Sequence, residues 1–184
     1  MGTDHPPAHR VLPPVGAHGA PSGPPVDTVS LDYEARMIRR KRLITDRGAA
    51  FLVDLAQTTS LEDGAGLELT DGRWIEVRAA PEDVVRVSGP MARLAWHIGN
   101  RHTPCQIAPD HLIIRRDHVL EAMLHQLGAV LEIAHAPFCP EGGAYGHGRT
   151  MGHDHGPDHS HSHSHVHSHN HDHTDDHALP HDHA

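Results

Sequence analysis

The 184-residue sequence has few aromatic residues, few cysteines and no long apolar run. Aromatics make up 3% of the chain, so a core must be built from Leu, Ile, Val, Ala and Met. Its two cysteines, Cys105 and Cys139, form no CxxC pair, which argues against a disulfide framework and favours reduced thiols. No apolar run approaches 18 residues and no charged-then-apolar leader is present. We therefore expect a soluble cytoplasmic protein with no membrane partner.

The sequence also lacks the motifs that mark common enzymes. It has no GxxxxGK[ST] phosphate loop, no GxGxxG after a strand, no HExxH and no GxSxG. The formal net charge of −9 makes the chain a poor general binder of phosphate. One basic cluster, RMIRRKRL at Arg36–Leu43, has no interleaved aromatics and indicates a solvated strand face or a contact for an acidic partner. We expect neither an enzyme nor a nucleic-acid partner.

Histidine is the residue in excess, with 23 copies in the chain. From His159 to His173 every second residue is histidine, and residues 147–184 contain almost nothing apolar, so we predict a disordered tail there. Neutral imidazole binds Ni²⁺, Cu²⁺ and Zn²⁺. We expect the tail, including His153 and His155, to bind several ions weakly and to release them between about pH 7 and pH 5.5.

The rest of the chain divides into three segments that differ in composition and in the spacing of their apolar residues. Residues 1–25 are dense in Pro, Gly and Ala and predict a disordered segment. Residues 26–87 contain short alternating apolar runs separated by turns, including Asp71-Gly72, and predict a small all-β domain. Residues 88–146 are assigned to a metal-binding domain.

Two helical patterns lie in the second half. One covers residues 91–98 and ends at Gly99-Asn100; the other begins after Asp117, a predicted N-cap, and ends before Gly128. With the short strands around them they give the order βαββαβ, which is ferredoxin-like. The fold is therefore predicted to be α+β.

Within the folded body, His97 and His102 are the first candidate ligands. Five residues apart on a helix, their rings point about 140° away from each other, so they converge only if His102 lies beyond the helix end. A single ligand per chain becomes a site when two chains meet at a two-fold axis. His118, which follows Asp117, is a further candidate ligand.

Residues 96–148 closely resemble the metal-binding half of UreE urease accessory proteins. The segment begins WHIGNRHTPCQIAPDHLIIRRDHVL at residues 96–120 and ends GGAYGHG at residues 142–148. The segment DYEARMIRRKRLITDRGAAFLVDL at residues 32–55 resembles the other half more loosely. The resemblance implies a homodimeric nickel metallochaperone, which delivers Ni²⁺ to apo-urease together with the GTPase UreG and further accessory proteins. Zn²⁺ and Cu²⁺ are further ions that the same ligands accept.

The resemblance also implies roles for particular residues. His102 meets its symmetry mate at the dimer interface and binds the ion, His147 adds a ligand, and His97 is auxiliary. Some members carry His-Asp-His before the second helix, where this chain has Arg116-Asp117-His118. The first ligand of that triplet is therefore absent, which leaves His118 alone at a secondary site.

Two other functions stay open from the sequence. One is a store or buffer of nickel or zinc that serves no particular client. Deleting residues 153–184 separates it from a carrier, because a store loses most of its function with the tail. The other is an enzyme that uses a tail-bound metal, which needs a shaped pocket with an open coordination position.

Overall fold

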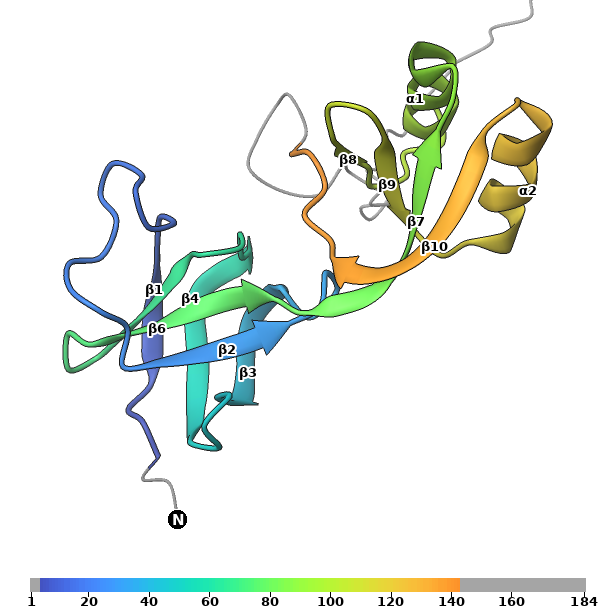
Figure 1. The fold of residues 1–184 in the computed structure, drawn as a ribbon. Coiled ribbons are helices and arrows are strands. Elements are labelled where there is room, and N and C mark those ends of the chain that lie inside the picture. The colour runs from blue at the N-terminus through green and yellow to red at the C-terminus, as the bar shows by residue number, and fades with distance from the viewer. Residues whose placement is uncertain (1–3, 143–184) are drawn as a thin grey trace, which may run out of the picture. The chain divides into compact units, whose positions relative to one another are not determined.

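The computed structural model describes residues 4–142, which form two β-sheets and two helices (Figure 1). The predicted disordered tail at residues 147–184 lies outside this range. Six strands make up the first sheet: β1 (Ala8–Leu12), β2 (Asp27–Leu31), β3 (Met37–Ile44), β4 (Ala50–Ser60), β5 (Gly66–Leu69) and β6 (Trp74–Ala79). Their order is β2-β6-β5-β1-β4-β3, in which β1 is parallel to β4 and β2 is parallel to β6.

Alternation of apolar and polar residues builds the core of the first sheet. Val29 and Leu31 of β2 are buried, as are Ile75 and Val77 of β6, and the residues between them are more exposed. Because successive side chains of a strand point to opposite faces, this spacing directs one face of each strand inward. The predicted hairpin between β5 and β6 is confirmed, with Gly72 at φ +83° in its turn.

The prediction of disorder over residues 1–25 is wrong for residues 8–12. These residues form β1, which pairs with β5 on one side and contacts β4 on the other, and Ala8 is fully buried. Proline and glycine dominate the surrounding composition and suggest disorder. The strand forms nevertheless, because its hydrogen-bonding partners lie more than 40 residues away, where no local pattern reveals them.

The second sheet belongs to the second half of the described chain. Its elements are β7 (Pro81–Ser88), α1 (Met91–Gly99), β8 (Gln106–Ile107), β9 (Leu112–Arg115), α2 (His118–Gln126) and β10 (Val130–Pro137). The strands are antiparallel in the order β10-β7-β9-β8, so the first and third strands of the unit lie in the centre. This arrangement confirms the predicted βαββαβ order and the α+β class.

The predicted domain boundary between residues 87 and 88 is wrong. The whole of β7 pairs with β10, and Val84–Val87 also pair with β9, so β7 is a central strand of the second sheet. The two sheets therefore divide at Ala80. The predicted βαββαβ order already included this strand as its first element, and only the boundary was placed after it instead of before it.

Both helices pack on one face of the second sheet (Figure 1). α1 places Leu94 and Ile98 one turn apart, and α2 does the same with Leu120 and Leu124; all four are buried. They form one hydrophobic cluster with sheet residues such as Val85. The 3.6-residue spacing read from the sequence is therefore the spacing of this core.

The opposite face of the second sheet contacts the connection between β2 and β3. Val84 and Ile113 point to this face and form a small cluster with Phe138. The ring of Tyr33 meets the ring of Phe138 edge-on, with the centroids 5.4 Å apart. The backbone N–H of Tyr33 donates a hydrogen bond of 2.8 Å to Oε1 of Glu82. Apolar and polar contacts thus join this connection to the start of β7 and the end of β10.

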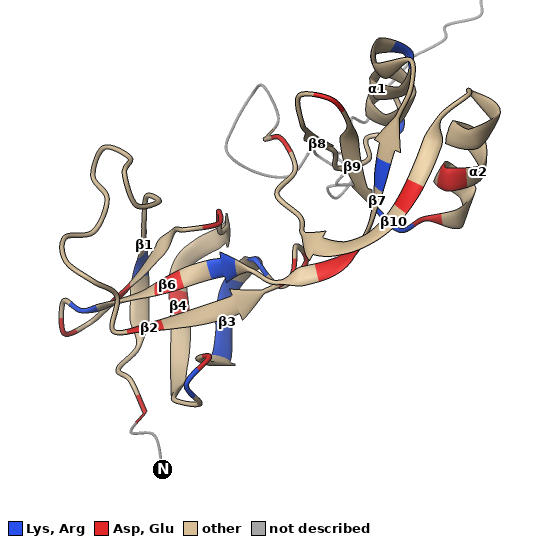
Figure 2. Cartoon of the chain, viewed as in Figure 1, with Lys and Arg blue, Asp and Glu red and all other residues tan. Residues whose placement is uncertain are grey.

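The basic cluster predicted from the sequence divides between two environments. Figure 2 shows basic residues along β3, and Arg39–Arg42 are all exposed there. Arg40 and Arg42 lie 3.7 and 3.4 Å from carboxylates. These four residues are therefore exposed in the single chain, which agrees with either of the two expectations, a solvated strand face or a contact for an acidic partner. Arg36, at the start of the cluster, is only 5% exposed and has a different role.

Candidate metal site

His102 lies in the loop that follows α1. After Gly99 the chain turns, with Arg101 N donating to Ile98 O at 3.1 Å and His102 N donating to Gly99 O at 2.9 Å. His102 has φ +54°, and it is the one non-glycine residue among residues 4–142 in the left-handed region. The residue is exposed. The turn therefore takes His102 out of the helix and leaves it exposed.

His97 lies in the last turn of α1, in different surroundings. Its ring is edge-on to the ring of Trp96, with the centroids 4.8 Å apart, and the residue is half-buried. Trp96 itself is 64% exposed, and Ile107 on the edge strand β8 is 60% exposed. Large apolar side chains are therefore exposed on the two elements that flank the His102 loop in the sequence.

His118 is the first residue of α2 and is exposed. Asp117 is the N-cap, as predicted, because its carboxylate accepts hydrogen bonds from two backbone N–H groups of the first turn. Arg116 pairs with Glu121, with Nε 2.8 Å from Oε1. The position before Asp117 is thus occupied by a guanidinium held by a carboxylate, and it offers no ligand to complement His118.

The structure does not bring these three histidines into one ligand set. Within residues 4–142 of one chain, no three His, Cys, Asp or Glu side chains are placed to hold a metal ion together. The other predicted ligands, His147, His153 and His155, lie outside the described residues. Their part in metal binding stays a prediction.

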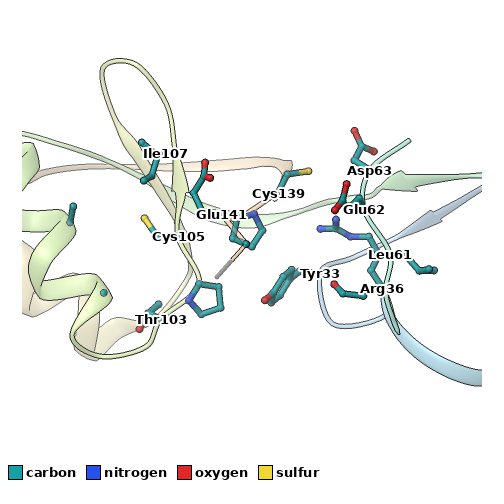
Figure 3. Close-up of a pocket in the computed structure, with 16 residues that line it drawn as sticks. Tyr33, Arg36, Leu61, Glu62, Asp63, Thr103, Cys105, Ile107, Cys139 and Glu141 are labelled. Carbon is teal, nitrogen blue, oxygen red and sulfur yellow. The ribbon is translucent and has the colours of Figure 1, made fainter. Parts of the chain in front are cut away.

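A cavity of about 600 Å³ lies between the His102 loop and the connection of β2 to β3 (Figure 3). Thr103 and Cys105 line it from the loop, and Tyr33 and Arg36 line it from the connection. The segment that follows β10 contributes Cys139 and its neighbours. Residues 60–63, at the end of β4, complete the lining, so four parts of the chain that are far apart in the sequence meet beside the loop of the candidate ligand.

The two cysteines of this cavity are free. Burial raises the pKa of the Cys105 thiol to about 11, and the carboxylate of Glu141 adds to the rise. Burial also raises the pKa of Cys139. Since the thiolate is the form that binds metal ions, the raised pKa values make both cysteines weaker ligands at neutral pH than an unperturbed cysteine.

The contacts made by the segment after β10 could not be predicted from the sequence. Arg36 was grouped with a solvated strand face, yet its Nη2 donates a hydrogen bond to the carbonyl of Phe138. Oε1 of Gln106 accepts a hydrogen bond of 2.9 Å from Cys139 N. No local signal in the sequence identifies the distant partners of Phe138.

Comparison with known proteins agrees with the two-sheet division. The family described as UreE urease accessory protein, N-terminal domain, matches residues 8–80, and the corresponding C-terminal domain family matches residues 82–184. Within residues 4–142 no helix is long and apolar enough to span a membrane.

Individual relatives are similar over most of their length. The urease accessory protein UreE of Cereibacter sphaeroides is 61% identical over 83% of this chain and 82% of its own. That of Rhodobacter capsulatus is 60% identical over 80% and 92%, and that of Ruegeria pomeroyi is 62% identical over 70% and 87%. The chain therefore belongs to the UreE urease accessory protein family, an accessory chaperone family in urease assembly rather than a family of enzymes.

Proposed function

We propose that this protein carries Ni²⁺ during urease assembly and passes it to the apo-enzyme. Two copies of the chain bind one ion where their His102 rings meet across a two-fold axis. Family membership supports the role in urease assembly. The exposed, left-handed placement of His102 beyond α1 is the observation on which the proposed site depends.

A symmetric contact between two chains is the simplest way for one histidine per chain to supply two ligands to the same ion. Two-fold dimers bring the same surface of each copy together, so one residue near the axis contributes twice. The exposed side chains of Trp96 and Ile107 support such a contact, because burying apolar surface stabilises an interface by about 25 cal/mol per Å². In this proposal the apolar flanks hold the copies together and the imidazoles bind the ion.

The histidine-rich residues 147–184 supply additional imidazoles. His147 completes the coordination shell of the shared ion, and His153 and His155 begin the series that gathers further ions. His97 and His118 are auxiliary. Imidazole also accepts Zn²⁺ and Cu²⁺, so selection of nickel depends on geometry and supply. Labile ligands suit delivery, since a very tight closed site would retain its ion.

The proposed partners follow from the same role. The recipient is the urease apoprotein in the cytoplasm, and further accessory proteins, including the GTPase UreG, assist the transfer. This chain has no GxxxxGK[ST] phosphate loop. Any nucleotide hydrolysis that drives assembly therefore comes from a partner.

Urease activation at limiting nickel tests the proposal. We expect His102→Ala to reduce activation by at least about tenfold, because replacing even an outer-shell partner of a metal site typically costs that much. His125→Ala is the matched control: it removes an exposed imidazole from the last turn of α2. Deleting residues 153–184 should raise the nickel requirement and leave partial activation. The opposite result, with the deletion abolishing activation and His102→Ala harmless, would favour a nickel store.

A further inference from the structure

The loop that carries His102, residues 100–105 between α1 and β8, is held at its two ends by different parts of the chain. We propose that residues 139–141, called the brace below, hold the downstream end of this loop and so position His102 for the shared ion. Gln106 is the positioning residue, because its side chain makes one of the two bonds to the brace. This inference rests on the proposed function, since it concerns how the ligand of the shared ion is held.

The upstream end of the loop is held by the last turn of α1. Arg101 N donates to Ile98 O at 3.1 Å. His102 N donates to Gly99 O at 2.9 Å. The guanidinium of Arg101 also donates to the carbonyl of His97, at 3.2 Å. These bonds fix the backbone from the helix as far as the amide of His102.

The middle of the loop has less support. Among residues 4–142, neither Thr103 nor Pro104 makes a backbone–backbone hydrogen bond, and both line the cavity beside the loop. A residue without such bonds keeps more of its conformational freedom. The position of the His102 backbone therefore depends on where the chain is next fixed, at Cys105 and Gln106.

The brace supplies that next fixed point. Cys139 N donates to Oε1 of Gln106 at 2.9 Å. Glu141 N donates to the carbonyl of Cys105, also at 2.9 Å. Figure 3 shows Cys105 and Glu141 on one side of the cavity and Arg36 on the other. Because β8 has two residues and lies at the edge of its sheet, its pairing with β9 is short, and the two bonds to the brace add restraint where it is needed.

The brace is itself held from its other end. Phe138, directly before it, is fully buried and lies edge-on to Tyr33. The carbonyl of Phe138 accepts a hydrogen bond from Arg36, which is 5% exposed. Among residues 4–142, Nε of Arg36 has no acceptor, so losing this bond would leave a further buried donor unsatisfied. Pro140 restricts the backbone between the two donors of the brace. The brace is therefore a fixed support for the loop.

Backbone entropy sets the size of the expected effect. Ordering the backbone of one residue costs the equivalent of about 5- to 30-fold in an equilibrium constant. With the brace in place, the loop is ordered before the ion binds. Without the brace, binding of the ion must order the loop. If one residue per chain is released, the apparent affinity of the shared ion should fall by at least about fivefold.

The test measures nickel binding at His102 itself in the full-length protein. A chelator buffer sets the free Ni²⁺, and peptide mass mapping gives the concentration that half-protects His102 from modification by diethyl pyrocarbonate. Gln106→Ala should raise this concentration by at least about fivefold, because Cys139 N loses its acceptor. Gln106→Glu should restore the native value, since a carboxylate oxygen also accepts from that N–H. Gln126→Ala, which truncates an exposed glutamine of α2, is the matched control.

A second pair of variants tests the other bond of the brace. Glu141→Pro removes the backbone donor to Cys105, whereas Glu141→Ala keeps this donor and removes only the carboxylate. Glu141→Pro should raise the half-protecting concentration by at least about fivefold, and Glu141→Ala should leave it within about twofold. Hydrogen exchange locates the change: in Gln106→Ala the amides of Cys139 and His102 should exchange faster, and those of α2 at the native rate.

Failure of the brace can be told from failure of the proposed function. If the same Ni²⁺ concentration protects His102 in the native chain, in Gln106→Ala and in Glu141→Pro, the brace is wrong and the shared site stands. Equal weakening by Gln106→Glu and Gln106→Ala would also overturn the brace, because the loss would not follow the hydrogen bond. If nickel does not protect His102 in the native chain, the shared site is wrong and the brace falls with it.

Discussion

We predict that the thiol of Cys105 reacts slowly, because burial keeps it protonated. The same protonation state affects whether a thiolate can compete with imidazole for nickel. The Cys105 pKa of about 11, compared with an ordinary value of 9.0, lowers the thiolate fraction about 100-fold at any pH below both values. The more basic thiolate is a better nucleophile, by about tenfold for a Brønsted coefficient of 0.4–0.5. Alkylation or disulfide exchange should therefore be at least about tenfold slower than for a free cysteine.

A Cys139→Ser variant isolates this thiol for the assay. Its reaction with a chromogenic disulfide is followed by stopped flow from pH 7 to pH 11.5, with the same chain unfolded in urea as the reference. The rate should keep rising by about tenfold per pH unit until about pH 11 in the folded protein, and should level off near pH 9 in urea. Equal rates in the two states, or a plateau near pH 9 in the folded protein, would refute the reasoning.

The same protonation state has a consequence for the metal. Binding of Ni²⁺ to Cys105 at neutral pH would first require loss of a proton that burial holds in place. Replacing Cys105 by Ser should therefore change nickel affinity by less than about twofold. A large loss of nickel in Cys105→Ser would mean that sulfur, and not imidazole, is the main ligand of the folded part.

Three further predictions concern stability. Asp117→Ala removes the N-cap of α2 and should lower the free energy of unfolding by about 1 kcal/mol, seen as a lower urea midpoint; an unchanged midpoint would contradict the cap. Phe138→Ala empties a fully buried position and should lower the free energy of unfolding by about 3–5 kcal/mol. A decrease below about 1 kcal/mol in urea unfolding would argue against the packing of Phe138 on the second sheet. Because the folded pKa of Cys105 lies above its unfolded value, its contribution is complete below about pH 9 and is lost as pH rises toward 11. The native chain should therefore lose more stability over that range than Cys105→Ser, and equal losses would exclude this linkage.

Local signals made the helices predictable from the sequence. The spacing of Leu94 and Ile98 defined the buried face of α1, and Asp117 marked the start of α2. Gly128, at φ +87°, terminates that helix as expected for a C′ glycine. Each of these features depends on residues within one or two turns, which is the range over which a sequence pattern carries information.

Non-local pairing explains what could not be predicted. β1 was missed because its partners lie in β4 and β5, and β7 was assigned to the wrong domain because its partners are β9 and β10. The contact between Arg36 and Phe138 spans 102 residues. For the site, the family resemblance singled out His102, and the structure added its exposed, left-handed placement. Only the structure could show which part of the chain lies beside the His102 loop.

Nickel titration of the full-length protein, with native mass measured at each step, tests the shared site most directly. The first and tightest ion should appear on a species of two chains, and His102→Ala should lose that species while His125→Ala keeps it. A first ion bound by single chains, or a two-chain species that persists in His102→Ala, would contradict the claim that paired His102 rings bind the ion.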